Sequence, residues 1–269
     1  MQTLSEIRAL LAERGLRPRH RFGQNFLHDK NQLQRLVDAA ELAPGAVVLE
    51  VGPGTGSLTE ALVDAGAQVV ACEIDKGLAS IVADRLGDRV QLVEGDCLHR
   101  SRELNPDVVG ALAGRSFTLV ANLPYQVAGT LIGTLLVHHP RCAGLFVTIQ
   151  KEVADRLAAG PGGKDYGALT IVVQALAEVR RIGDLAPTCF WPQPKVTSSM
   201  FAVRPRADHG VDDRVGLAEF VSRLFTHRRK QLGTTLGRDA TIWPEGIDPS
   251  MRPESLRVDQ ILALWRLHR

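Results

Sequence analysis

Four consecutive residues, Asn122, Leu123, Pro124 and Tyr125, combine groups that could hold a flat ring bearing an amino group. The Asn122 side-chain oxygen and a backbone carbonyl at Leu123 or Pro124 could accept both protons of that amino group. Pro124 fixes the turn and lacks a competing N–H, and Tyr125 offers a face on which a flipped-out base can stack. An ordinary strand-to-helix turn would also explain the Asn and the Pro. It gives no reason for the tyrosine, so the pattern favours a base-binding pocket.

A glycine-rich loop in the stretch VVLEVGPGTGSLTEAL carries a second group of candidate residues. Gly52, Gly54 and Gly56 stand between an expected strand and its helix, where glycine permits a tight turn and a close approach of the backbone to a ligand. Their order, G-x-G-x-G, differs from the G-x-G-x-x-G of dinucleotide-binding folds. With Glu50 just before it, the loop resembles the first motif of S-adenosylmethionine-dependent methyltransferases.

Acidic residues stand at the ends of the next two expected strands. Glu73 lies 21 residues after Gly52, where a carboxylate can accept hydrogen bonds from two ribose hydroxyls, and Asp75 is the alternative for that role. Asp96 ends a further strand, where it can accept from an adenine amino group. Each acid could instead cap a turn or a helix. Together with Glu50 they favour an adenosyl pocket, and an acidic surrounding suits the sulfonium of S-adenosyl-L-methionine better than a pyrophosphate.

The charge of the chain is divided unevenly along its 269 residues. The net charge of +2 is the sum of +3 for residues 1–30, −6 for residues 31–179 and +5 for residues 180–269. Two basic ends around an acidic middle favour a phosphate-rich partner, although a solvated surface is the plainer alternative.

Several classes of protein are disfavoured by composition. Hydrophobic residues make up 45% and charged residues 23%, which is typical of a globular chain. No stretch approaches the roughly 18 apolar residues that a membrane span needs, and residues 1–20 resemble an amphipathic helix more than a signal peptide. The four cysteines are scattered, so neither a disulfide framework nor a zinc site is expected. We therefore expect a cytoplasmic protein without a metal.

Short strand-like runs alternate with helical patterns through the first three-quarters of the chain. The expected strands cover residues 46–51, 68–73, 90–94, 117–121 and 144–149, and the expected helices cover 58–64, 77–86, 127–137 and 150–158. This alternation predicts right-handed βαβ units and a mostly parallel sheet with helices on both faces.

The alternation ends in the last third of the chain. Runs at 169–179 and 198–203 look like two strands joined by a Pro-rich loop, which predicts an antiparallel pair at the edge of the sheet. Beyond them the sequence becomes basic and helical, with apolar residues at intervals of three and four. We expect an α/β domain with a seven-stranded sheet over residues 1–205 and a small α-helical domain over residues 206–269.

The chain also resembles one known family over nearly its whole length. Beside Asn122–Tyr125 it contains, in the order of that family, RFGQNFL (21–27), VLEVGPGTGSLT (48–59), QKEVADRLAAGPGGKDYGALT (150–170), FWPQPKVTSS (190–199) and FTHRRKQL (225–232). These segments are similar to the small-subunit ribosomal RNA adenine dimethyltransferases, the KsgA family. The resemblance implies a Rossmann-like class I methyltransferase domain. It also implies N6-dimethylation of two adjacent adenines in a hairpin loop near the 3′ end of small-subunit rRNA, late in subunit assembly.

The resemblance assigns further site residues. It implies that S-adenosyl-L-methionine is held by Asn25, Leu27, Gly52, Glu73, Asp96 and Asn122. It implies a second aromatic wall at Phe190, opposite Tyr125, for which core packing is the alternative. It also gives the basic cluster Arg228, Arg229 and Lys230 a role in contacting RNA phosphates, although cations are favoured at a helix C-terminus in any case. Residues 17–21 (RPRHR) would form a second such patch.

The expected partner is small-subunit rRNA within an assembling subunit, bound by a monomer. One alternative is an enzyme of the antibiotic-resistance type that methylates large-subunit rRNA, but the RRK and PGGKDYG segments favour the small-subunit branch. The other is a non-catalytic assembly factor on the same fold. An idle copy would have no reason to keep all of Gly52, Glu73, Asp96, Asn122 and Tyr125.

Overall fold

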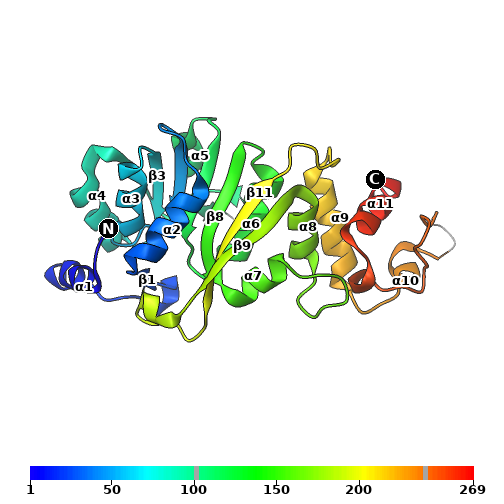
Figure 1. Ribbon diagram of the computed structural model, residues 1–269. Coiled ribbons are helices and arrows are strands. Elements are labelled where there is room, and N and C mark those ends of the chain that lie inside the picture. Colours follow the sequence, from blue (N-terminus) through cyan, green and yellow to red (C-terminus); the bar gives the residue numbers. More distant parts are fainter. Residues whose placement is uncertain (100–102, 239–241) are drawn as a thin grey trace.

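The computed structural model describes residues 1–99, 103–238 and 242–269, and a seven-stranded sheet forms its centre (Figure 1). The strand order is β4-β3-β2-β7-β8-β11-β9. The first five strands in this order run parallel, whereas β11 runs antiparallel to both β8 and β9. In chain order the strands are β2 (Val47–Val51), β3 (Gln68–Glu73), β4 (Val90–Glu94), β7 (Phe117–Asn122), β8 (Cys142–Gln150), β9 (Ala177–Leu185) and β11 (Ser198–Pro205). The predicted parallel sheet with an antiparallel edge pair is confirmed.

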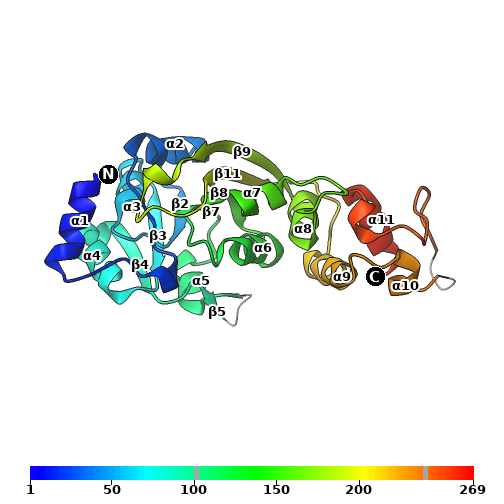
Figure 2. The same cartoon turned by 90° about the horizontal axis from the view of Figure 1, so that it is seen from below.

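Helices cover both faces of the sheet because its central strands are apolar on both sides, as is usual for parallel strands. Val48 of β2 packs into one apolar cluster with Leu36 of α2 (Lys30–Ala40), whereas Leu49 packs into another with Leu135 of α6 (Ala128–His138). Figure 2 shows α2 on one side of the sheet and α6 on the other. The remaining helices of this part are α1 (Leu4–Glu13), α3 (Ser57–Asp64), α4 (Lys76–Leu86), α5 (Pro106–Leu112) and α7 (Lys151–Leu157).

The strand predicted at 169–179 is wrong for most of its length. Residues Ala168–Leu176 form helix α8, and the edge strand β9 begins only at Ala177. The β-branched run Ile171–Val173 resembles a strand in sequence, but it is buried because α8 packs among α6, α9 (Arg214–Thr226) and α11 (Val258–Leu267). A short apolar run of this kind cannot be assigned from periodicity alone.

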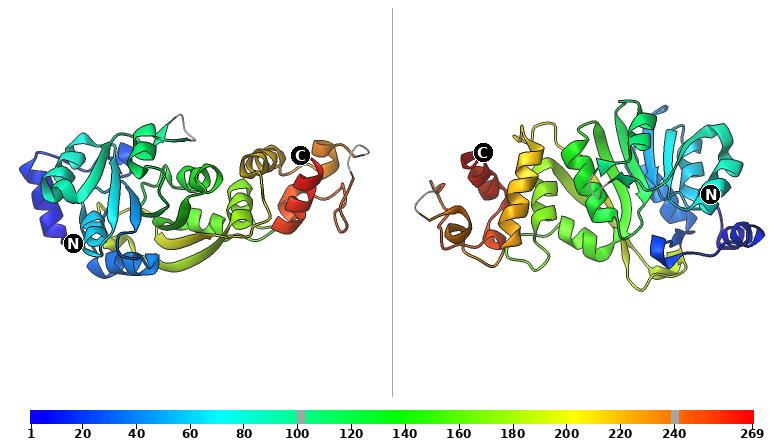
Figure 3. Two further views of the ribbon diagram at one scale, coloured as in Figure 1. Left: turned by 90° about the horizontal axis from the view of Figure 1, so that it is seen from above. Right: turned by 180° about the vertical axis from the view of Figure 1, so that it is seen from behind.

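Helices α9 (Arg214–Thr226), α10 (Leu232–Leu236) and α11 (Val258–Leu267) form the C-terminal part, at the opposite end of the molecule from α1 (Figure 3). One apolar cluster contains Leu135 of α6, Val173 of α8, Leu224 of α9 and Leu264 of α11. The core is therefore continuous across residue 206. The division into an α/β domain (1–205) and a small helical domain (206–269) stays a proposal.

Two short ladders complete the fold. Strand β1 (Phe26–Leu27) pairs antiparallel with β10 (Phe190–Trp191), and β5 (Leu98–His99) pairs with β6 (Glu103–Leu104). The first ladder fastens the N-terminal segment to the loop between the two edge strands. Single turns of 3-10 helix occur at His20–Phe22, Gly87–Arg89, Pro187–Cys189 and Pro253–Ser255.

Candidate active site

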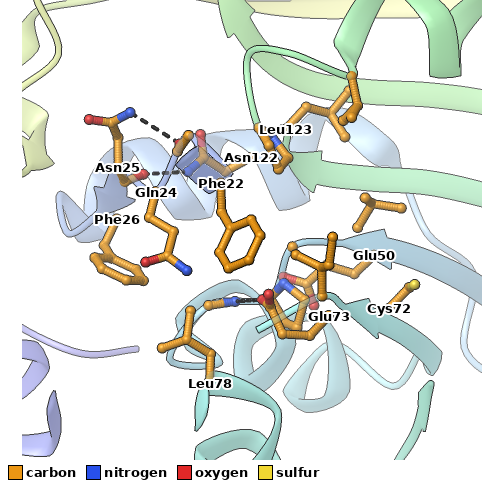
Figure 4. A pocket seen from close by; sticks show the side chains of 18 of the residues that line it. Phe22, Gln24, Asn25, Phe26, Glu50, Cys72, Glu73, Leu78, Asn122 and Leu123 are labelled. Atoms are coloured by element: carbon orange, nitrogen blue, oxygen red, sulfur yellow. Dashed lines mark hydrogen bonds between the residues drawn. The ribbon is translucent and has the colours of Figure 1, made fainter. Parts of the chain in front are cut away.

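A cavity of about 280 Å³ lies at the carboxyl ends of β2, β3, β4 and β7 (Figure 4). Parallel α/β sheets bind their ligands at this edge, beyond the strand ends. The lining comes from the residues that follow these four strands and from the segment 21–27 of the N-terminal region. The cavity brings together most of the predicted site residues, namely Asn25, Leu27, Gly52, Gly54, Glu73, Asp96, Asn122, Leu123, Pro124 and Tyr125.

The glycine loop is tied to the end of β3 by the Glu73 carboxylate. The Gly54 N–H donates to Glu73 Oε2 over 3.1 Å, and the Asp75 N–H donates to Glu73 Oε1 over 2.9 Å. Gly54 has a φ of +62°, and a Cβ there would lie 3.0 Å from the Phe26 ring. Glycine is therefore required at this position on two counts, backbone conformation and space. Both carboxylate oxygens keep a second lone pair for a ligand.

Asp75, the alternative to Glu73, is occupied elsewhere. It caps α4 by accepting from the Gly77 N–H at 3.0 Å, and it also accepts from the Gln24 side chain at 3.1 Å. Arg19 lies 3.4 Å from the same carboxylate, and Asp75 is not among the residues that line the cavity. Between the two acids, the geometry favours Glu73 as the ligand-facing group.

Gln2 and Arg85, which the sequence did not point to, hold the backbone of the glycine loop in place. The Thr55 carbonyl accepts from the Gln2 side-chain amide at 2.8 Å and from the Arg85 guanidinium at 2.6 Å. Gln2 also accepts from the Thr55 hydroxyl at 2.6 Å. Both partners are distant in sequence from the loop, and neither belongs to a recognisable local pattern.

Two buried carboxyl groups give the cavity its electrostatic character. Burial raises the pKa of Glu50 to about 8 and that of Glu73 to about 7; the neighbouring Glu73 further raises the pKa of Glu50, and Asp75 further raises that of Glu73. Glu50 Oε2 has no hydrogen-bond partner among the described residues. A cation entering the cavity would compensate for this burial. S-adenosyl-L-methionine, a cationic ligand, therefore fits the site, and Glu50 and Glu73 are among the residues that would hold it.

Asp96 lies at the open side of the cavity and is exposed. Its Oδ1 accepts from the Leu98 N–H at 3.0 Å, and its backbone carbonyl accepts from the Asn105 side chain at 2.9 Å. Asp96 therefore does cap a turn, but only through Oδ1. Its Oδ2 accepts no hydrogen bond from a described residue. The predicted contact to an adenine amino group requires only this second oxygen.

Asn122 ends β7 with its side chain held in one orientation. Its Nδ2 donates to the backbone carbonyl of Asn25 over 2.9 Å, so Oδ1 is the atom left for a ligand (Figure 4). The Pro124 carbonyl accepts from the Val127 N–H at 3.2 Å, whereas the Leu123 carbonyl accepts from none of the described residues. Of the two backbone acceptors left open by the sequence, the geometry therefore favours Leu123.

The two predicted aromatic walls differ in position. Tyr125 is half-buried and lines the cavity, and its hydroxyl lies 2.7 Å from Ser198 Oγ. Phe190 is only 1% exposed, belongs to the apolar cluster that contains Leu36 of α2 and Leu62 of α3, and is not among the residues that line the cavity. Its role as a wall therefore stays a prediction from the resemblance. Phe22, which sequence reasoning missed, projects its ring into the cavity between Asn122 and Glu73 (Figure 4).

The β1–β10 ladder explains how Asn25 and Leu27 reach the cavity. Leu27 is paired with Phe190 and Phe26 with Trp191, and the His28 N–H donates to the Cys189 carbonyl at 3.0 Å. The two segments are more than 160 residues apart, so no local pattern could have revealed their pairing.

The basic cluster after α9 divides into two kinds of residue. Arg228 is half-buried, and its guanidinium donates to Glu254 at 2.9 Å and to the Lys164 carbonyl at 3.2 Å. Arg229 and Lys230 are exposed. In Figure 1 the C-terminal end of α9 lies on the same lower edge as α7, which follows the carboxyl end of β8.

Within the parts of the chain that the structure describes, no group of three or more His, Cys, Asp or Glu side chains is placed to hold a metal ion. Likewise, none of the helices in residues 1–99, 103–238 and 242–269 has both the length and the apolar content needed to cross a membrane.

The sheet order, with one antiparallel strand inserted beside the last parallel one, and the cavity at the strand ends define a Rossmann-like methyltransferase fold. Residues 15–268 match the family described as "Ribosomal RNA adenine dimethylase". The chain belongs to this family.

Individual relatives agree with this assignment. The chain is 40% identical to "Ribosomal RNA small subunit methyltransferase A" of Mycobacterium leprae, over 97% of this chain and 90% of the relative. Among solved structures, it is similar to a dimethyladenosine transferase from Plasmodium falciparum, with a TM-score of 0.72, 24% identity and coverage of 89% and 95% of the two chains, which shows a shared fold. It is also similar to the 23S rRNA methyltransferase ErmE, with a TM-score of 0.67, 26% identity and coverage of 91% and 100%.

Proposed function

We propose that the chain is an S-adenosyl-L-methionine-dependent enzyme that dimethylates N6 of two adjacent adenines in the 3′-terminal hairpin of small-subunit rRNA. Membership of the dimethylase family and 40% identity to a small-subunit methyltransferase support the reaction and the RNA. The observation that carries the proposal is the geometry at the end of β7. There, the fixed Asn122 side chain and the Leu123 carbonyl lie beside a cavity lined by carboxylates.

The target amino group is a poor nucleophile because its lone pair is delocalised into the adenine ring. Asn122 Oδ1 and the Leu123 carbonyl are proposed to accept its two N–H protons, which draws the nitrogen toward tetrahedral geometry and localises the lone pair. When bound, S-adenosyl-L-methionine would supply the electrophilic methyl group. The N6 lone pair would form the new N–C bond as the methyl carbon–sulfur bond of the donor breaks and leaves a neutral thioether, and the resulting ammonium would release a proton to solvent. No dedicated general base is required, and Tyr125 holds the flipped base by stacking.

The RNA is proposed to lie along the edge that carries the cavity mouth and the end of α9. Arg229 and Lys230 are exposed there, which supports phosphate contacts by these two residues. Arg228 is proposed to act on the protein side by holding the segment around Lys164, since its guanidinium is half-buried and already donates to Glu254 and to the Lys164 carbonyl. Residues 17–21 are proposed as the second phosphate-facing patch. We further propose that the enzyme acts as a monomer in the cytoplasm.

Small ribosomal subunits that lack the methyl groups test this function. The purified protein is incubated with them and with labelled S-adenosyl-L-methionine, and the products are mapped on the RNA. Label on two adjacent adenines near the 3′ end of small-subunit RNA is expected. Because ErmE shares the fold at 26% identity, large subunits are assayed in parallel. Label in large-subunit RNA would favour the antibiotic-resistance alternative, and RNA binding without any label would favour a non-catalytic factor.

A further inference from the structure

Ser198 is the only described residue whose side chain is hydrogen-bonded to the Tyr125 hydroxyl. The two oxygens are 2.7 Å apart, although the residues are 73 positions apart in sequence. Tyr125 belongs to the turn between β7 and α6, whereas Ser198 is the first residue of β11. The contact therefore joins the base-binding turn to the antiparallel strand of the sheet.

Ser198 is a rigid partner. Its side chain is 0% exposed, and its backbone is paired with Gln150 of β8 on one side and Leu185 of β9 on the other. The residue before it is also held, because the Thr197 carbonyl accepts from the Lys151 N–H at 2.9 Å. A hydroxyl in this position has little freedom to follow a moving ring.

The other end of Tyr125 is held by its own turn. The Leu123 N–H donates to the Thr148 carbonyl at 3.0 Å, and the Pro124 carbonyl accepts from the Val127 N–H. Gly23 packs against the same turn, since a Cβ there would lie 3.5 Å from the Tyr125 nitrogen. The tyrosine hydroxyl oxygen lies on the axis about which χ2 turns, so fixing it together with the backbone fixes χ1, which is the direction in which the ring projects into the cavity.

We propose that Ser198 is a positioning residue that sets the direction in which the Tyr125 ring projects into the cavity, and so its place for stacking on the flipped adenine. This inference rests on the proposed function, because it assigns Ser198 a role in the same base pocket. It accounts for a tyrosine where phenylalanine would supply the same stacking face. Burial raises the pKa of Tyr125, which keeps the hydroxyl protonated and able to donate.

The alternative is that Ser198 only stabilises the start of β11. Ser199 provides a matched control, because it is also fully buried but points to the opposite face, as successive residues of a strand do. Its hydroxyl donates to Asp184 at 2.6 Å and has no contact with Tyr125. S199A therefore removes a buried hydroxyl from the same strand while leaving the aromatic wall in place.

The test measures single-turnover methyl transfer to undermethylated small subunits by the wild type, S198A, Y125F, S199A and the S198A/Y125F double variant. S198A and Y125F should each slow transfer by about ten-fold, the effect of losing one hydrogen bond. The double variant should be no slower than either single variant, because both remove the same contact. S199A should transfer at the wild-type rate. Calorimetry should show unchanged binding of S-adenosyl-L-methionine throughout.

Two results would overturn the inference. One is S198A transferring as fast as the wild type, and the other is the two losses multiplying in the double variant, as a separate structural effect would require. If S198A does not fold, Y125F decides alone, since a wild-type rate for it would refute any role of the hydroxyl. The proposed function is judged on the wild type: failure to methylate small-subunit adenines would reject it independently of the Ser198 variants.

Discussion

The carboxyl ends of β2 and β3 and the turn at Asn122–Tyr125 line the same cavity but are held by different kinds of contact. The first region, the adenosyl half, consists of Gly52, Gly54, Glu50 and Glu73. Glu73 braces it between neighbouring strand ends, and Gln2 and Arg85 hold the backbone of the glycine loop. The second region, the base half, is held by residues from remote segments, namely Asn25 and Ser198.

Mutations in the two halves should therefore have different effects. The adenosyl half depends on backbone conformation and on buried charge, so its residues should affect cofactor binding and stability. The base half depends on the orientation of single polar groups, so its residues should affect turnover. The following predictions test this separation, beginning with the largest expected effect.

Asn122→Ala should abolish most of the turnover and leave cofactor binding nearly intact. It removes the acceptor for one N–H of the target amino group, and we expect a loss of about 10²- to 10³-fold in kcat, the usual effect of removing one transition-state hydrogen bond. Single-turnover kinetics and calorimetry measure the two effects separately. An Asn122→Ala variant with wild-type turnover would remove this residue from the mechanism.

Gly54→Ala should do the reverse and act mainly on the cofactor. A side chain at this positive φ costs about 1–2 kcal/mol of strain, and its Cβ would meet the Phe26 ring at 3.0 Å. We expect the Kd for S-adenosyl-L-methionine to rise by roughly ten-fold, the equivalent of about 1.4 kcal/mol. Gly45→Ala, also at a positive φ but with open space around it, is the control for backbone strain alone. Equal cofactor affinity in the wild type and Gly54→Ala would contradict the assigned role.

Arg229→Ala and Arg228→Ala should separate RNA contact from internal support. Loss of Arg229 should lower the slope of RNA affinity against salt by about one charge and leave the melting temperature unchanged. Loss of Arg228 removes a half-buried ion pair with Glu254, so it should lower stability by about 1 kcal/mol. Binding titrations at several salt concentrations and thermal unfolding test both. If Arg228→Ala changed only the salt slope, its assigned role would be wrong.

Glu50→Gln should flatten the dependence of stability on pH in the absence of ligand. The folded protein retains a proton on Glu50 up to about pH 8, whereas the unfolded chain releases it near 4.5. The native state thus binds more protons between these values, so the wild type should lose stability as the pH rises through that window. Melting temperatures at pH 5, 6.5 and 8 measure this, with Glu94→Gln as an exposed control. Parallel curves for the wild type and Glu50→Gln would argue against a buried protonated carboxyl.

The two halves of the cavity also differ in how well they could be predicted from the sequence. The adenosyl half could be predicted because Gly52, Glu73 and Asp96 follow strands whose ends meet at one edge of a parallel sheet. The cluster at Asn122–Tyr125 was predictable for its residue types, but the orientation of Asn122 depends on the carbonyl of Asn25 and could not be. Helix α8 could not be predicted because its β-branched run, Ile171–Val173, favours a strand, and its helical form depends on packing against remote helices. The sequence could not show that Arg228 differs from Arg229 and Lys230, because its partner, Glu254, lies 26 positions away.

The continuous apolar core from α6 through α8 to α9 and α11 has a consequence for choosing a substrate. C-terminal helices packed into this core cannot move independently of the sheet. The fold therefore fixes the distance between Arg229 and Tyr125. Only an RNA whose phosphate and target adenine are separated by that distance can contact both residues at once. We therefore expect the enzyme to recognise the folded shape of its subunit as much as the nucleotides it modifies.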